Sequence, residues 1–201
     1  QGVGGALDLG EAFLKALRTR CSETGALLIS DEVQCGMGRT GYPFAANLYG
    51  FSPDMITTAK ALGAGFPCAA LLMADHVAGR LKTDDLGTTF GGGMLAMAAV
   101  TATLEAVEKD RMLANVKSVE AHLRQRLREV EQVVAVHGRG MLLGIEFNDK
   151  AQPIHQALLE RKVISDVLVE RGGTCCGLTA CDERISQCLL DKALLRAELA
   201  V

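Results

Sequence analysis

The sequence predicts an α/β fold. Segments with apolar residues at helical spacing alternate along the chain with short apolar runs that are bounded by glycine, proline or a charged residue. A hydrophobic content of 49% with 22% charged residues is enough to build a core, and 201 residues correspond to one or two domains. We therefore expect a mainly parallel sheet with helices, followed by a smaller α+β part.

The first half of the chain supplies the expected sheet and its helices. Leu9, Phe13 and Leu17 recur at helical spacing before a break at Thr24-Gly25. The run that ends in Asp31 is continuously apolar, as in a strand buried on both faces of a parallel sheet. The segments expected here are a helix over 9–21, strands over 26–31, 54–58 and 68–73, and a helix over 94–107.

The second half begins at a break at Lys109-Asp110. We take this break as the domain boundary, with residues 1–108 in one domain and 109–201 in the next. After it the sequence predicts a helix over 113–130, strands over 133–136 and 141–147 around a turn at 137–140, and a helix over 153–161.

Composition and charge exclude several kinds of partner. A net charge of −3 without a cluster of lysine or arginine, no tryptophan and only two tyrosines argue against a nucleic-acid partner. The longest uncharged apolar stretch, residues 68–74, is far too short to span a membrane. A small-molecule ligand is the better expectation.

The seven cysteines predict a reduced, cytoplasmic protein without a metal site. Their number is odd, and Cys21, Cys35 and Cys68 are scattered among the helix and strand patterns, as small buried residues would be. The other four, at 175, 176, 181 and 188, are adjacent or irregularly spaced. That spacing does not match the paired cysteines of a zinc ribbon.

Lys60 and Asp31 are the candidate site residues that chemistry alone suggests. Lys60 follows a predicted strand among small uncharged residues, where loss of solvation lowers the pKa of an amine and makes it a nucleophile, as in Schiff-base lysines. Asp31 alone would more often be a helix cap or a solvated carboxylate. Together they suit pyridoxal phosphate, whose aldehyde binds an amine and whose pyridine nitrogen pairs with an anion.

Three further segments have both a functional and an ordinary interpretation. Residues 36–41 match the dinucleotide fingerprint in letters, but four residues separate them from the strand and Tyr42-Pro43 follows, so a surface glycine loop is favoured. Residues 87–93 precede a helix and form either an anion site or a plain N-cap. His137 and Arg139 either bind an anion or are solvated in a turn.

Four stretches of this sequence resemble one known family. They are residues 28–41 (LISDEVQCGMGRTG), 53–67 (PDMITTAKALGAGFP), 87–92 (GTTFGG) and 138–146 (GRGMLLGIE). Their order and spacing are similar to those of the class III, ornithine-type aminotransferases of PLP fold type I, and most closely to the acetylornithine aminotransferases. The resemblance runs from Gln1 to about Ile164 and implies the C-terminal part of the large domain plus the small domain.

The resemblance implies a role for each matching residue. Lys60 would form the Schiff base with pyridoxal 5'-phosphate and carry a proton between the substrate carbon and the cofactor, and Asp31 would pair with the pyridinium nitrogen. Gln34 would bond the phenolic oxygen, and Thr89 would reach the cofactor phosphate of a neighbouring subunit. The implied protein is a homodimer with active sites at the interface. It would transfer an amino group from N-acetylornithine, the amino donor, to 2-oxoglutarate, a 2-oxo acid acceptor.

Departures from the family pattern leave alternatives open. The family's main phosphate-binding loop, the aromatic that stacks on the cofactor and the substrate-binding arginine correspond to no part of this sequence, which indicates a fragment or a natural truncation. Gly93-Met94 stands where asparagine-proline is usual, and after Ile164 the cysteine-rich tail departs from the pattern. The alternatives are another class III reaction, of the 4-aminobutyrate, succinylornithine or diamine type, and a non-catalytic fragment.

Overall fold

The computed structural model describes most of the chain as two compact units. The described residues are 2, 4–148, 150–161, 163, 166–168 and 175–178. The first-sheet unit consists of residues 9–38 and 42–113, and the second-sheet unit of residues 1–8, 39–41 and 114–201. Two cysteines of the tail, Cys181 and Cys188, lie outside the described residues.

The first-sheet unit contains every strand and helix expected in that part of the chain, with each end within three residues of its predicted place. Its elements are α1 (Glu11–Thr24), β1 (Ile29–Asp31), α2 (Ala45–Leu48), β2 (Met55–Thr58), the 3-10 helix η1 (Lys60–Gly63), β3 (Ala70–Met73), α3 (Asp75–Ala78) and α4 (Met94–Lys109). The short helices α2, η1 and α3 were not expected, because four residues are too few to show helical periodicity.

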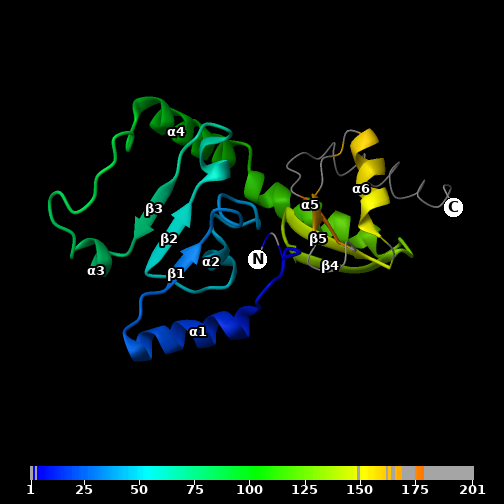
Figure 1. The fold of residues 1–201 in the computed structure, drawn as a ribbon, viewed down its shortest axis with the longest axis horizontal. Coiled ribbons are helices and arrows are strands. Elements are labelled where there is room, and N and C mark those ends of the chain that lie inside the picture. The colour runs from blue at the N-terminus through cyan, green and yellow to red at the C-terminus, as the bar shows by residue number, and fades with distance from the viewer. Residues whose placement is uncertain are drawn as a thin grey trace. The chain divides into compact units, whose positions relative to one another are not determined.

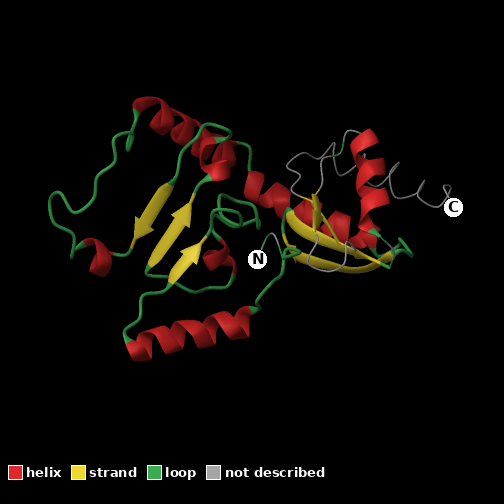
Figure 2. Ribbon diagram, in the orientation of Figure 1, coloured by secondary structure: helices red, strands yellow, loops and turns green. Residues whose placement is uncertain are grey.

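The three strands of this unit form one sheet in the order β1-β2-β3 (Figures 1 and 2). β1 runs parallel to β2, with Asp31 opposite Thr57. β3 runs antiparallel to β2, with Leu71 opposite Thr57. The connection from β2 to β3, residues 59–69, contains only the single turn of η1, and a parallel return needs a longer crossover. The expected parallel arrangement therefore holds for one of the two pairings.

The apolar run before Asp31 is less buried than the sequence predicts. Leu28 is buried, but Leu27 and Ile29 are 51% and 52% exposed. β1 lies at the edge of the sheet, so β2 covers only one of its sides. The prediction of a strand buried on both faces is therefore wrong. Leu28 points to one face, which is covered, whereas Leu27 and Ile29 point to the other, which the described residues leave largely exposed.

The second-sheet unit combines an antiparallel sheet with helices. Its elements are α5 (Met112–Leu127, from Ala114 onward), β4 (Val133–Arg139), β5 (Leu142–Phe147), α6 (Ala151–Glu160), β6 (Asp166–Leu168) and β7 (Cys175–Leu178). The sheet order is β4-β5-β7-β6, with every pairing antiparallel. The core lies between α5, α6 and β5. Its buried members are Val119, Leu123, Leu127, Met141, Leu143, Ile145, Phe147, Ala151, Leu158 and Val163.

The turn between β4 and β5 comes later than expected. β4 continues through His137 to Arg139, and the chain turns at Gly140, whose φ is +59°. The backbone of Arg39 and Thr40 lies against Gly140 and leaves no room for a Cβ atom. The N–H of Met141 donates to the carbonyl of Arg39 over 2.8 Å. Glycine is therefore needed here for both its positive φ and its small size.

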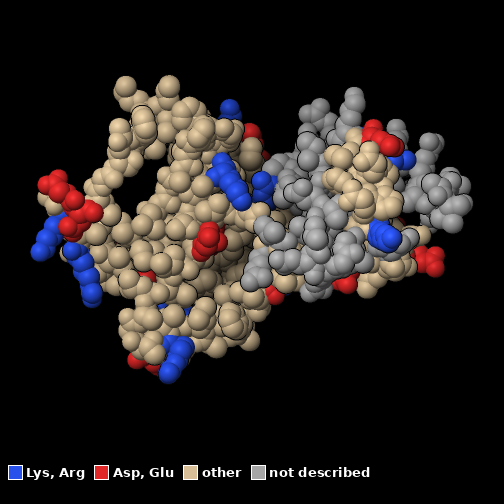
Figure 3. Space-filling model, viewed as in Figure 1, with Lys and Arg blue, Asp and Glu red and all other residues tan. Residues whose placement is uncertain are grey.

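The described residues contain neither a helix long and apolar enough to cross a membrane nor a group of three or more potential metal-ligating side chains. On the face drawn in Figure 3, the charged side chains of the first-sheet unit lie mostly toward its margins, and most of that surface is uncharged.

Candidate active site

Asp31 and Lys60 lie at the same edge of the first sheet. β1 ends at Asp31 and the parallel strand β2 ends at Thr58, two residues before Lys60 opens η1. Because the two strands are hydrogen-bonded neighbours with Asp31 opposite Thr57, their carboxyl ends are adjacent. Ligands of open α/β sheets bind at this kind of edge. The fold thus brings the predicted carboxylate and the predicted amine to adjoining strand ends.

Hydrogen bonds to one oxygen fix the Asp31 carboxylate. Its Oδ1 accepts from the hydroxyl of Thr57 and from the backbone N–H of Val33, each over 3.1 Å. Asp31 is exposed, and within the described residues its Oδ2 accepts no hydrogen bond. One oxygen therefore orients the group while the other can accept a hydrogen bond from a ligand.

Lys60 is exposed and has an unusual backbone conformation. Its φ is +47°, in the left-handed region that residues other than glycine rarely adopt, and Ala64 at the other end of η1 has φ +49°. Such strain costs about 1–3 kcal/mol per residue and is concentrated at functional sites. Within the described part of the chain Lys60 Nζ has no hydrogen-bond or ion-pair partner. The expected loss of solvation is not found, because the edge of the sheet around Lys60 is open.

Gln34 is half-buried in a turn directly after β1. The N–H of Glu32 donates to Thr57, and the N–H of Gly36 donates to the carbonyl of Glu32 over 3.0 Å, so the turn closes around Gln34. The prediction that this glycine loop lies at the surface is wrong, because three of its glycines are buried: Gly36, Gly38 and Gly41. Two of them, Gly38 and Gly41, do have the positive φ expected of glycines in a turn. No helix opens on Gly41, since α2 begins only at Ala45, so the context of a dinucleotide site is missing.

Thr89 is placed in a different segment from the other three predicted residues. It lies in an exposed turn before α4. Phe90 in that turn and Met94, the first residue of α4, are each 89% exposed. No side chain caps the N-terminus of α4, and Gly93 occupies the cap position. The described contacts do not join Thr89 to Asp31, Gln34 or Lys60, so its predicted role remains a prediction.

Sequence reasoning missed Glu32, which is 1% exposed. Its carboxylate accepts from the backbone N–H of Ala45 over 2.5 Å and of Ala46 over 2.8 Å, and from the hydroxyl of Ser30. The available signal was a charged residue directly after an apolar run and before a glycine-rich turn. The partners that explain it lie thirteen and fourteen residues further along the chain.

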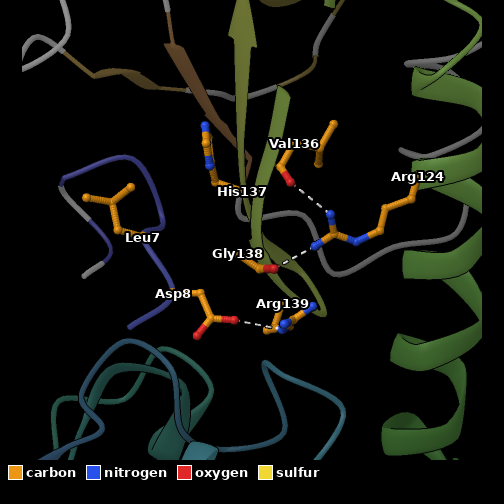
Figure 4. A pocket seen from close by; sticks show the side chains of 7 residues that line it. All are labelled: Leu7, Asp8, Arg124, Val136, His137, Gly138 and Arg139. Carbon is orange, nitrogen blue, oxygen red and sulfur yellow. Dashed lines mark hydrogen bonds and ion pairs between the residues drawn. The ribbon is translucent and has the colours of Figure 1, made fainter. Parts of the chain in front are cut away.

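His137 and Arg139 line a hollow in the second-sheet unit, and each has an acidic partner; Figure 4 draws the pair of Arg139 with Asp8. His137 Nε2 lies 2.8 Å from Glu146, and Arg139 is paired with Asp8. Arg124 donates to the carbonyls of Val136 and Gly138 and so holds β4 against α5. These contacts give His137 and Arg139 a structural role, so the alternative that they bind an anion is not favoured.

Solved structures of aminotransferases match this fold. The ornithine aminotransferase of Toxoplasma gondii ME49 superposes with a TM-score of 0.87 at 26% identity, over 100% of this chain and 51% of that one. A second structure of the enzyme from that organism, crystallised in the presence of oxidised glutathione, has PLP at partial occupancy in its active site. It superposes with a TM-score of 0.85 at 26% identity, over 99% of this chain and 50% of that one.

Curated relatives are more similar in sequence. A [LysW]-aminoadipate semialdehyde/glutamate semialdehyde transaminase of Sulfurisphaera tokodaii is 42% identical over 150 residues, 73% of this chain and 39% of its own length. Acetylornithine aminotransferase 1 of Bordetella bronchiseptica is 41% identical over 175 residues, 85% of this chain and 44% of its own length. The chain thus spans less than half the length of these relatives. The model of the family "Aminotransferase class-III" matches residues 1–179, and the chain belongs to that family.

Proposed function

We propose that this chain is the part of a pyridoxal 5'-phosphate-dependent aminotransferase that carries the reactive lysine, and that the enzyme is of the acetylornithine type. The observation that carries the proposal is the placement of Asp31 and Lys60 at adjoining ends of two parallel strands. Membership of class III and the similarity to acetylornithine aminotransferases support the same reaction.

The residues at this edge fit the proposed cofactor. A pyridine nitrogen that carries a proton needs an anionic acceptor, and Asp31 offers the Oδ2 that accepts no hydrogen bond within the described residues. An aldehyde needs a primary amine that is not held in an ion pair, and Lys60 Nζ meets this requirement among the described residues. When bound, the cofactor supplies a ring that accepts electrons from the substrate carbon.

Each residue then has a defined task. Thr57 and Val33 hold Asp31 so that its second oxygen accepts the pyridinium N–H and keeps that proton in place. Gln34 donates to the phenolic oxygen. With the cofactor bound, Lys60 would act first as nucleophile. Once substrate has displaced it, Lys60 would be the base that removes the proton from the substrate carbon bearing the transferred amino group, and the acid that delivers that proton to C4′ of the cofactor.

The finer features of the proposal extend beyond one chain. Thr89 would bind the cofactor phosphate of a partner subunit, which makes the enzyme a homodimer with active sites at the interface. Residues 1–108 would form the C-terminal half of the large domain and residues 109–201 the small domain. The exposure of Thr89, in a turn that also exposes Phe90, supports a contact outside this chain. The cysteine pattern supports a cytoplasmic location.

Reductive trapping tests the assignment of Lys60. The purified chain is incubated with pyridoxal 5'-phosphate and reduced with borohydride, and the labelled peptides are identified by mass spectrometry. The label is expected on Lys60 and is expected to disappear in Lys60→Ala. The matched control Lys82→Ala removes another exposed lysine and should leave the labelling of Lys60 unchanged. Labelling spread equally over the surface lysines would contradict the assignment.

The amino donor requires a separate assay. The two relatives reported above are 42% and 41% identical to this chain and act on different substrates, so identity does not separate them. Formation of glutamate from 2-oxoglutarate is measured with N-acetylornithine, ornithine and 4-aminobutyrate as donors. A preference for N-acetylornithine is expected. A preference for 4-aminobutyrate would reassign the substrate while leaving the role of Lys60 intact.

A further inference from the structure

Glu32 is a buried carboxylate that has no cationic partner among the described residues. Its residue surface is 1% exposed, and the described residues place no lysine, arginine or histidine within ion-pair distance of it. Burying a charged group is costly unless hydrogen bonds replace the lost water. A residue of this kind has to be explained by its hydrogen bonds.

Four donors surround the carboxylate of Glu32. Oε1 accepts from the backbone N–H of Ala46 at 2.8 Å and from the hydroxyl of Ser30 at 3.2 Å. Oε2 accepts from the backbone N–H of Ala45 at 2.5 Å and from the thiol of Cys35 at 3.8 Å. The donors come from β1, from the turn that follows it and from the first residues of α2. The side chain therefore joins β1 and the turn after it to α2, which begins thirteen residues later in the sequence.

The backbone of Glu32 is fixed as well. Its N–H donates to the carbonyl of Thr57 at 2.9 Å, which extends the pairing of β1 with β2 by one residue. Its carbonyl accepts from Gly36, where an added Cβ atom would lie only 2.7 Å from that same oxygen. Gln34 stands midway in this closed turn. The position of Gln34 thus depends on the residue two places before it.

We infer that Glu32 is a positioning residue, whose buried carboxylate ties the end of β1 to α2 and so holds Gln34 and Asp31 in their places at the strand edge. Glu32 does not itself touch the cofactor. The consequence for cofactor binding rests on the function proposed above, whereas the anchoring of the turn does not.

A glutamine at position 32 could not accept the same set of hydrogen bonds. A carboxylate accepts hydrogen bonds on both oxygens, whereas an amide replaces one acceptor by an N–H donor of nearly equal size. Either Ala45 or Ala46 would then face a donor, and a buried N–H would lose its partner. Glu32→Gln is therefore a change of chemistry with little change of shape.

The test compares Glu32→Gln with Asp54→Asn. Asp54 is also a buried carboxylate of the first-sheet unit, but it precedes β2 and so lies at the opposite end of that strand from Lys60. Hydrogen exchange of single amides is followed in the chain without cofactor. In Glu32→Gln, protection of Gly36, Ala45 and Ala46 is expected to fall roughly tenfold or more, as loss of a hydrogen bond to a charged group implies. Protection of the β2–β3 ladder should remain within about twofold.

The outcomes separate a positioning role from a general loss of stability. Asp54→Asn should lower protection around Leu28 and Met55 and leave the turn at 32–46 protected. Unchanged protection of Ala45 and Ala46 in Glu32→Gln would overturn the inference, as would an equal loss over the whole unit. In the borohydride assay, Glu32→Gln should retain Lys60 as the labelled residue but need a higher cofactor concentration. If the parent chain takes no label, the proposed function fails, and the exchange data still decide the role of Glu32.

Discussion

Asp54→Asn tests whether one charge holds together the end of the first sheet away from the candidate site. The side chain of Asp54 is 10% exposed. Its Oδ2 accepts from the N–H of Leu28 at 2.6 Å and from Arg18 at 2.9 Å, and its Oδ1 lies 3.1 Å from Nε2 of His76. These partners belong to α1, the residue before β1, and α3. One carboxylate thus joins three segments around the start of β2.

The expected cost follows from what asparagine can still do. Its single carbonyl oxygen can accept from Leu28, but its amide turns a donor toward either Arg18 or His76. One hydrogen bond to a charged group is lost, and such bonds are worth about 1.5–3 kcal/mol. Arg18 is 25% exposed and is partly rehydrated when it loses its partner, so the lower part of that range applies. We expect the free energy of unfolding to fall by about 2 kcal/mol at pH 7.

The pH dependence supplies the sharper test. The hydrogen bond from Leu28, followed by the Arg18 guanidinium, holds the pKa of Asp54 below its ordinary value. A carboxyl whose pKa is lowered on folding stabilises the fold fully above its ordinary pKa of about 4, and this contribution is lost as the pH falls through the folded pKa. The difference between parent and variant should therefore be largest at pH 7 and shrink below about pH 4.

Urea unfolding, followed by circular dichroism and by exchange of the Leu28 amide, measures the difference at several pH values. The matched control is Asp84→Asn, which removes an exposed carboxylate from a loop of the same unit and should change the free energy of unfolding by less than about 0.5 kcal/mol. A loss for Asp54→Asn that stays as large as at pH 7 when the pH is lowered to about 2 would refute the reasoning, because the stabilisation would then not depend on the charge of the carboxyl.

Two further changes test the core and the buried turn. Leu123 is 2% exposed in the core of the second-sheet unit, so Leu123→Ala should lower the free energy of unfolding by about 3 kcal/mol. Leu159 is 40% exposed, so Leu159→Ala should lower it far less. Similar losses for the two variants in urea unfolding would contradict this packing. Burial and the Glu32 carboxylate raise the pKa of the Cys35 thiol to about 11. Alkylation of Cys35 by iodoacetamide should therefore stay slow until the pH approaches that value, and should be faster in Glu32→Gln. Equal alkylation rates in the two proteins at every pH would contradict this prediction.

The backbone positions of the central site residues could be predicted because local sequence determines them. An apolar run that stops at Asp31 and a second that stops shortly before Lys60 place both residues at strand ends. Consecutive strands are usually neighbours, so a shared edge was a reasonable expectation. The segments 54–58 and 94–107 were predicted for the same reason, since each contains a complete local pattern.

What could not be predicted depends on contacts between distant residues. The role of Glu32 comes from Ala45 and Ala46, which begin a helix too short to show a period. The exposure of Lys60 depends on what surrounds the strand edge, and small uncharged neighbours in the sequence do not determine that. The late turn at Gly140 is set by Arg39 and Thr40, about one hundred residues earlier. Sequence patterns describe the local surroundings of a residue along the chain, but they do not identify the distant residues that folding brings into contact with it.

The division of the chain has a consequence for the order in which it folds. Residues 1–8 and 39–41 belong with a unit whose remaining members begin at residue 114. The ion pair of Asp8 with Arg139 and the hydrogen bond between Arg39 and Met141 therefore form only after the later residue of each pair has been synthesised. At roughly 5–20 residues per second, a ribosome needs about 7–26 s to make the stretch between Asp8 and Arg139. Until that stretch has been made, Asp8 lacks Arg139 and Arg39 lacks Met141. This unit should therefore be completed late, and the formation of these two contacts should be a slow, non-local step.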